Sequence, residues 1–191
     1  LGEPVGIKVH LCGVAPQGRL DIDAYKQALG PKTAIASVMW ANNETGTIFP
    51  VAELAKVAHE AGALFHTDAV QAVGKIPIDL KSTEIDMLSL SVHKLHGPKG
   101  IGALYVRKGV KFKGLVQGGH QERGRRGGTE NAPAIVGLGK AAELAAVMGS
   151  FSDGVTVALQ ERGDLIEEMT AAGGDARHVL EHEEFGRVVL V

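Results

Sequence analysis

The feature of this sequence that most constrains its fold is the alternation of apolar, strand-like runs with helix-like segments. The strand-like runs cover residues 33–40, 63–68, 85–90 and 100–107. The helix-like segments cover residues 21–29, 50–61 and 132–148. This alternation predicts an α/β fold in which helices flank a mostly parallel sheet. Residues 5–11 alternate between apolar and polar side chains, which predicts a further strand at an edge.

Length and charge limit the classes of protein to which the chain can belong. Its 191 residues suffice for one domain, or for one domain and the start of another. The formal net charge of −2 gives no reason to expect nucleic acid or an anionic membrane as a partner. The single cysteine excludes an internal disulfide and favours a cytoplasmic location. The chain begins with Leu1 in the middle of a βαβ-like series, which predicts a fragment of a longer protein or the product of a partial gene.

Polar side chains follow three of the predicted strands. Asn43 comes after the first of these strands, Asp68 ends the second, and Ser91, His93 and Lys94 follow the third. Ligands of parallel sheets bind beyond the carboxyl ends of the strands. The sequence therefore predicts that one pocket collects these side chains.

A lysine and an acid in this pattern suggest a particular cofactor chemistry. Enzymes that use pyridoxal 5′-phosphate (PLP) need a Schiff-base lysine and an acidic partner for the pyridine nitrogen. Lys94 suits the first role, and Asp68 suits the second. The alternatives are a basic surface loop around Lys94 and a turn or helix-cap role for Asp68. The rival lysines are Lys75, which has no pattern of partners around it, and Lys99, which we expect to face solvent.

Four ordered blocks carry a resemblance to a known family. The blocks are residues 42–46, 66–71, 91–100 and 118–129. They resemble the class V aminotransferase family of PLP-dependent enzymes, and more narrowly the cysteine desulfurases of the nitrogenase and iron–sulfur assembly type. The resemblance covers roughly residues 5–147. It implies an aspartate aminotransferase-like (fold type I) large domain, with its carboxyl-side part in residues 1–147. Residues 148–191 would be a divergent tail or the start of the small domain.

The resemblance also implies roles for individual residues around the cofactor. Lys94 would form the Schiff base and act in catalysis, while Asp68 would hold the pyridine nitrogen protonated. Gln71 would bind the phenolic oxygen. Asn43 would reach the cofactor and the substrate carboxylate side, with Asn42 as the nearby alternative.

The remaining implied cofactor contacts concern the phosphate group. Ser91 and His93 resemble phosphate ligands, and Thr129 resembles the residue that a second subunit lends to the phosphate, which implies a homodimer. Thr129 could also cap the helix that begins near Ala132. The histidines show no paired spacing that indicates a metal site, so we assign no metal.

The activity implied by the resemblance is sulfur removal from L-cysteine. The products would be alanine and an enzyme-bound persulfide for iron–sulfur cluster assembly, with a sulfur acceptor or scaffold protein as a possible partner. The sole cysteine, Cys12, lies upstream of every block, so the chain lacks a recognisable catalytic cysteine. Val92 stands where the family typically has glycine, and we expect a strained turn there if that site needs a positive φ or a close backbone approach. The alternatives are a selenocysteine lyase or another class V enzyme, and an inactive fragment that binds PLP or dimerises.

Overall fold

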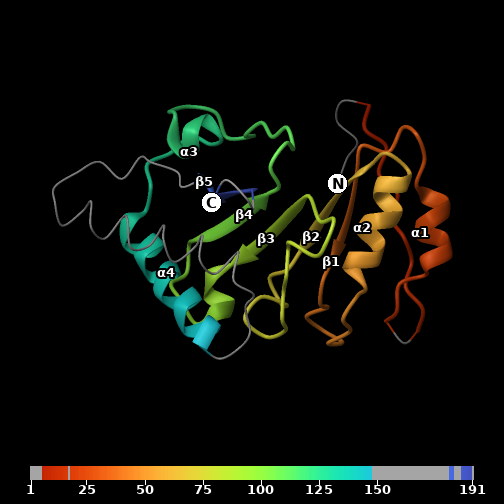
Figure 1. Cartoon of the computed structure of the whole chain (residues 1–191), viewed down its shortest axis with the longest axis horizontal. Helices are drawn as coiled ribbons and strands as arrows, with labels where there is room; N and C mark the ends of the chain where they lie inside the picture. Colours follow the sequence, from red (N-terminus) through yellow and green to blue (C-terminus); the bar gives the residue numbers. More distant parts are fainter. Residues whose placement is uncertain (1–5, 17, 148–180, 183–185, 191) are drawn as a thin grey trace.

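The computed structural model describes residues 6–16, 18–147, 181–182 and 186–190, and Figure 1 shows their arrangement. The strands form one sheet in the order β1-β2-β3-β4-β6-β5. Their bounds are β1 Ile35–Met39, β2 Leu64–Asp68, β3 Met87–Ser91, β4 Gly102–Val106, β5 Glu181–His182 and β6 Gly186–Leu190. The helices are α1 Ile22–Ala28, α2 Val51–Glu60, α3 Gln121–Gly124 and α4 Ala132–Val147, with a short 3-10 helix, η1, at Val92–Leu95.

The three strands that precede the predicted site residues run parallel. β1 pairs in parallel with β2, and β2 pairs in parallel with β3. β4 then joins β3 in the antiparallel sense, and β6 pairs antiparallel with both β4 and β5. The α/β class predicted from the sequence is confirmed. Strands β1, β2 and β4 lie inside the expected runs, and β3 extends one residue beyond its run, to Ser91.

One predicted strand is wrong. Residues 6–11 form no strand, and Ile7, Val9 and Leu11 are exposed. Alternating side chains favour a strand only where a neighbouring strand accepts its backbone hydrogen bonds. Among the residues that the structure describes, no strand lies in register beside this segment.

The three predicted helices are confirmed, and local chemistry explains their ends. The Asp21 carboxylate accepts a hydrogen bond from the Ala24 backbone N–H at 2.9 Å and so caps the start of α1. Helix α2 ends before Gly62, whose φ of +79° is a left-handed conformation that favours glycine. Helix α4 covers 16 residues of the alanine-rich segment.

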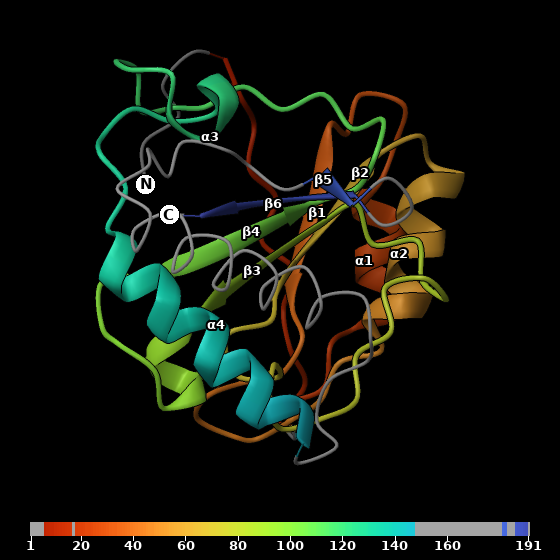
Figure 2. The ribbon, with the colours of Figure 1, turned by 60° about the vertical axis from the view of Figure 1, so that its left-hand side comes forward.

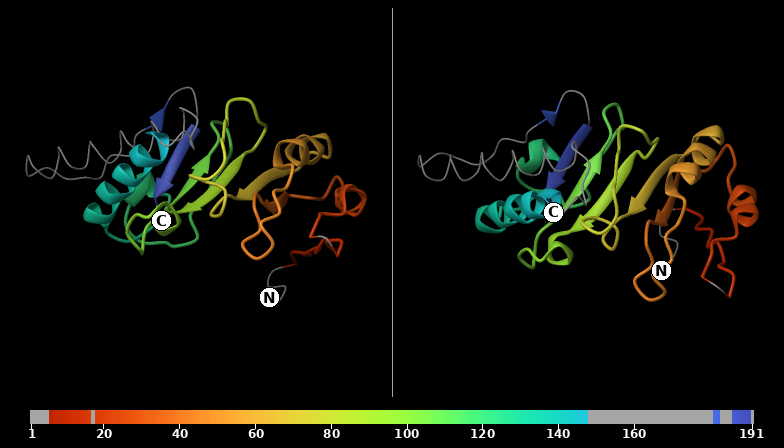
Figure 3. Two further views of the ribbon diagram at one scale, coloured as in Figure 1. Left: turned by 90° about the horizontal axis from the view of Figure 1, so that it is seen from below. Right: turned by 60° about the horizontal axis from the view of Figure 1, so that its bottom comes forward.

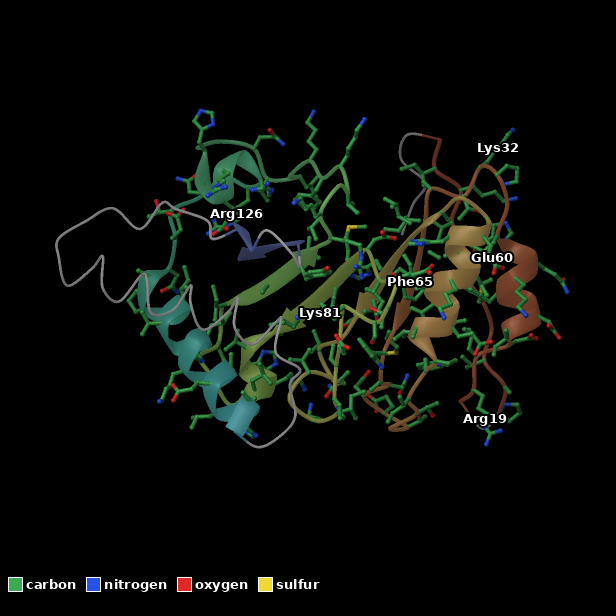
Figure 4. The ribbon with its side chains drawn as sticks, viewed as in Figure 1. Arg19, Lys32, Glu60, Phe65, Lys81 and Arg126 are labelled. Carbon is green, nitrogen blue, oxygen red and sulfur yellow. The ribbon has the colours of Figure 1, made fainter. Side chains whose placement is uncertain are left out.

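The core lies on one face of the sheet. Alternate side chains of the strands, including Phe65 and Leu88, are buried there in a single cluster with residues of both α2 and α4. Helices α1 and α2 lie together beside β1 and β2, whereas α4 lies at the other end of the sheet (Figures 2 and 3). Phe65 lies beside α2 (Figure 4) and is fully buried.

Helix η1, which carries Lys94, is held by close packing on two sides. Gly97, directly after η1, lies so near Val92 and Ala141 of α4 that a Cβ would overlap the Val92 side chain. On the other side, the Leu95 side chain occupies the space that a Cβ at Gly74 would need. The position of η1 is therefore fixed by α4 and by the turn that contains Gly74.

The strain expected at Val92 is not found, which is a correction to the sequence analysis. Val92 is fully buried at the start of η1, and its φ is not positive. The left-handed residue is instead His96, the C-cap of η1, with φ +62° and ψ +15°. A β-branched residue is accommodated because the backbone reversal occurs four residues later.

Candidate active site

The carboxyl ends of the three parallel strands lie side by side. Met39 pairs with Asp68, and Asp68 pairs with Ser89. The Trp40 backbone N–H donates to the Asp68 carbonyl oxygen at 2.8 Å, and the Ala69 N–H donates to the Ser89 carbonyl oxygen at 2.9 Å. The segments that follow these strands therefore start from one edge of the sheet, as the sequence predicted.

Asp68 is half-buried at the end of β2. Its Oδ1 atom accepts a hydrogen bond from the Val70 N–H at 2.9 Å, so the carboxylate does shape the following turn. Within the described part of the chain, its Oδ2 atom accepts no hydrogen bond. One carboxylate oxygen thus stabilises the turn while the other remains available to a ligand.

Ser91 and His93 form a polar pair at the start of η1. The Ser91 Oγ and His93 Nδ1 atoms are 2.7 Å apart. If the hydroxyl donates to Nδ1, then Nε2 carries the proton of the neutral ring and is a free donor on an exposed side chain. Such donors suit an anion.

Lys94 lies on η1 and is half-buried, whereas Lys99 is exposed beyond the Gly97-Pro98 turn. Among the described residues, no carboxylate or carbonyl oxygen accepts a hydrogen bond from Lys94. A lysine amine without a carboxylate partner is better suited to nucleophilic chemistry than one held in an ion pair.

The sequence analysis did not predict that Lys75 contacts Gln71. The Lys75 Nζ atom donates to the Gln71 backbone oxygen at 3.3 Å and to the Gln71 side-chain Oε1 atom at 3.2 Å. Burial lowers the pKa of Lys75, and the positive charge of Lys94 lowers it further. The spacing of four residues between Gln71 and Lys75 was the available signal, because residues four apart are neighbours in a helical turn.

A second missed contact lies on the sheet itself. The Ser37 Oγ and His66 Nδ1 atoms are 2.8 Å apart, and the two residues face each other across β1 and β2. Burial lowers the pKa of His66, and the nearby Asp68 carboxylate partly opposes this effect. The pair joins the two strands one pleat before Asp68.

The two asparagines after β1 differ in their contacts. The Asn42 Oδ1 atom accepts hydrogen bonds from the Glu44 and Thr45 N–H groups at 2.8 and 2.9 Å, so Asn42 builds the turn. Asn43 is exposed and donates through Nδ2 to Glu44 Oε1 at 2.6 Å. This difference favours Asn43 over Asn42 as the residue free to meet a ligand.

The cap that was expected from Thr129 is wrong. The cap is Asn131, whose Oδ1 atom accepts a hydrogen bond from the Ala134 N–H at 3.2 Å. Thr129 is exposed, and within the described residues its side chain forms no hydrogen bond with Ser91, His93 or Lys94. The single chain does not connect Thr129 to the strand-end residues.

Cys12 lies away from these residues. It packs against the main core and interacts electrostatically with Tyr25 of α1, at the opposite end of the sheet from α4 (Figure 1). Burial, and to a smaller extent the nearby Cys12, raise the pKa of Tyr25 to about 12.

A cavity of about 370 Å³ lies near the start of β3, at the opposite end of this strand from Ser91. Its lining includes Val106, Lys111, Phe112 and Arg125. Because Val106 pairs with Met87 at the start of β3, the cavity is remote from Ser91 at the end of that strand. It belongs to a different surface from the strand-end residues.

Two further properties concern only the described residues. They contain no cluster of three or more histidine, cysteine, aspartate and glutamate side chains placed to hold a metal ion. No helix among them has the length and apolar character needed to cross a bilayer.

Comparison with known proteins gives consistent matches. The aminotransferase class-V family matches residues 1–156. A cysteine desulfurase of Gluconacetobacter diazotrophicus is 76% identical over 140 residues, which are 73% of this chain and 35% of that protein. The chain therefore spans about a third of the length of this curated relative.

Solved structures give the same fold. A NifS-like protein matches with a TM-score of 0.71 and 36% identity, over 95% of this chain and 49% of that one. A structure described as SspA in complex with cysteine matches with a TM-score of 0.65 and 37% identity, over 88% of this chain and 48% of that one. These matches confirm the expected PLP-dependent transferase fold, and the chain belongs to the class-V aminotransferase family.

Proposed function

We propose that this chain carries the PLP-binding core of a cysteine desulfurase. The observation that carries the proposal is the convergence of Asp68, the Ser91–His93 pair and Lys94 at the ends of adjacent parallel strands. The 76% identity to a protein named cysteine desulfurase supports the choice of reaction. The substrate would be L-cysteine, and the similar SspA structure is itself a complex with cysteine.

The donor set of the site fits PLP, the cofactor on which the class-V family depends. The free Oδ2 atom of Asp68 would meet the pyridine nitrogen, and the Ser91 and His93 side chains would donate to the phosphate. Lys94 would supply the amine that holds the cofactor, and Asn43 and Gln71 would contact its ring substituents. When bound, PLP supplies an electron sink for negative charge at the substrate α-carbon.

The protein residues have distinct tasks in this proposal. Asp68, as an anion, keeps the partner nitrogen protonated through charge attraction. Lys94 would take the proton from the substrate α-carbon. Ser91 and His93 would orient the cofactor by holding its phosphate end, and the Val92 side chain between them is buried.

The sulfur step needs a thiol that the described residues do not bring to the site. In the overall reaction the carbon–sulfur bond of L-cysteine breaks, sulfur passes to an acceptor thiolate as a persulfide, and the carbon skeleton leaves as alanine. Cys12 packs beside α1 and is not part of the strand-end cluster. This observation favours a second candidate, a chain that binds PLP or dimerises without catalysis.

We infer a homodimer and a cytoplasmic location as parts of the same proposal. Thr129 is exposed and unconnected to the site of its own chain, which suits donation to the phosphate of a second subunit. A sulfur acceptor or iron–sulfur scaffold protein would take the sulfur onward.

Alanine formation tests the proposed reaction. The purified chain is loaded with PLP and given L-cysteine and an excess of a dithiol, and alanine is measured by mass spectrometry. Alanine that disappears in Lys94→Ala supports the desulfurase. Alanine from L-selenocysteine alone indicates a selenocysteine lyase, and bound PLP without alanine from either substrate indicates the non-catalytic candidate.

A further inference from the structure

The contact between Lys75 and Gln71 fixes the direction of an amide group. Lys75 Nζ lies within 3.3 Å of both the backbone oxygen and the side-chain Oε1 atom of Gln71. An ammonium group has three N–H donors and no acceptor, so only the oxygen of the amide can face it. The NH2 group of Gln71 must then point away from Lys75.

The turn that carries both residues is built as a unit with Asp68. The Ala72 and Val73 N–H groups donate to the Ala69 carbonyl oxygen, and the Lys75 N–H donates to the Ala72 carbonyl oxygen. Asp68 holds the start of this turn through the Val70 N–H. The backbone positions of Gln71 and Lys75 are therefore linked to Asp68 through this turn.

The same turn is packed directly against the helix that carries Lys94. Gly74 has a φ of +75°, and the Leu95 side chain fills the space where a Cβ would lie. Gly74 thus brings its neighbour Lys75 close to η1. The positive charge of Lys94 contributes to the lowered pKa of Lys75, after burial.

One consequence follows from this arrangement for a cofactor held by Asp68 and Lys94. An outward NH2 group on Gln71 is a donor for an anionic oxygen, whereas a rotated amide would present an oxygen and repel it.

We propose that Lys75 is a positioning residue that locks the Gln71 amide with its NH2 group toward the phenolic oxygen of PLP. The inference rests on the proposed function, because it assumes that PLP binds at Lys94. It assigns a role to a lysine that sequence patterns leave without one.

The test compares three variants of the full chain. Lys75→Met keeps the length of the side chain but removes the donor and the charge, and Lys75→Arg keeps both. Lys56→Met is the matched control, because Lys56 is an exposed lysine on α2. The measurements are the dissociation constant for PLP and the absorbance maximum of bound PLP, with the modified lysine mapped by mass spectrometry after borohydride reduction.

We expect Lys75→Met to weaken PLP binding about 3- to 10-fold, the effect of losing one hydrogen bond to a charged donor on a partly solvated side chain. The absorbance maximum should change. Lys75→Arg should restore most of the affinity and the spectrum. Lys56→Met should match the wild type in both measurements.

A double-mutant cycle shows whether Lys75 acts through Gln71. In a Gln71→Ala background, Lys75→Met should leave the absorbance maximum where Gln71→Ala alone puts it, because the amide is already gone. Equal effects of Lys75→Met with and without Gln71 would overturn the amide-locking role. An unchanged denaturation midpoint in Lys75→Met excludes a general loss of folding.

The outcomes separate this inference from the proposed function. If the wild-type chain takes up no PLP at Lys94, the proposed function fails, and Lys75 has no cofactor to act on. If the wild-type chain binds PLP at Lys94 and Lys75→Met is identical to it in affinity and spectrum, only the inference about Lys75 fails.

Discussion

Replacement of Gly74 by alanine should be among the most damaging single-methyl changes in this chain. Gly74 has a φ of +75°, and an added Cβ would overlap the Leu95 side chain, which is itself buried. A left-handed backbone costs a residue with a Cβ about 1–2 kcal/mol. Overlap with a packed side chain costs about 1–3 kcal/mol more. Gly74→Ala should therefore lower the free energy of unfolding by about 2–5 kcal/mol.

Gly62 offers a matched control for this prediction. It has nearly the same backbone conformation, with φ +79°, but no atom lies within 4 Å of the place where its Cβ would be. Gly62→Ala should carry only the backbone cost of about 1–2 kcal/mol. The difference between the two variants isolates the contact with Leu95.

Urea denaturation gives both free energies of unfolding. The only tryptophan, Trp40, is buried and reports unfolding through its fluorescence. A loss for Gly74→Ala that exceeds the loss for Gly62→Ala by about 1–3 kcal/mol supports the packing described. Equal losses in the two variants would refute the claim that the turn and η1 are held together through Leu95.

Two further predictions concern buried titratable groups. Tyr25 Oη donates to the Leu54 carbonyl oxygen at 3.0 Å, so Tyr25→Phe should lower the free energy of unfolding by about 1 kcal/mol. The pKa of Tyr25 is raised from near 10 to about 12, so the folded state keeps the proton longer and wild-type stability should fall as the pH rises from 10 to 12. A pH series of melting temperatures in which Tyr25→Phe falls as steeply as the wild type would contradict this. Because the pKa of His66 is lowered, the unfolded chain binds a proton first, and stability should decline as the pH falls below about 6.5. His66→Gln should flatten that decline, and an unchanged slope would mean that His66 is not its source.

Helix ends and strand cores were predictable from the sequence because local chemistry decides them. Asp21 caps α1 by accepting a hydrogen bond from a residue three positions later, and Gly62 supplies the left-handed residue that ends α2. The buried strand β2 ends in Asp68, as its apolar run indicates. In each case the deciding contacts are close in sequence.

Contacts between segments that are distant in sequence were not predictable. The segment 6–11 has the alternation of a strand, but a strand also requires a neighbouring strand, which the pattern cannot supply. Strain was expected at Val92, yet the left-handed residue is His96. That location depends on how η1 packs between Gly74 and α4.

Two other differences between the prediction and the structure concern polar contacts within a few residues along the chain. Thr129 and Asn131 are both good caps, and Asn131 forms the cap because it stands directly before Ala132. The spacing of four residues between Gln71 and Lys75 indicates a contact only if residues 69–76 form helix-like turns, which the backbone hydrogen bonds show and the sequence did not predict.

The most direct test of the proposed cofactor site is to identify the lysine that binds PLP. The purified chain is mixed with PLP, its visible absorbance is recorded, the sample is reduced with borohydride, and the modified peptide is mapped by mass spectrometry. We predict a new absorbance band and a reduced pyridoxyl group on Lys94, both absent in Lys94→Ala and present in Lys99→Ala. A folded chain that shows no band, or that carries the group on Lys75 or Lys99 instead, would contradict the assignment of the strand-end cluster as the cofactor site.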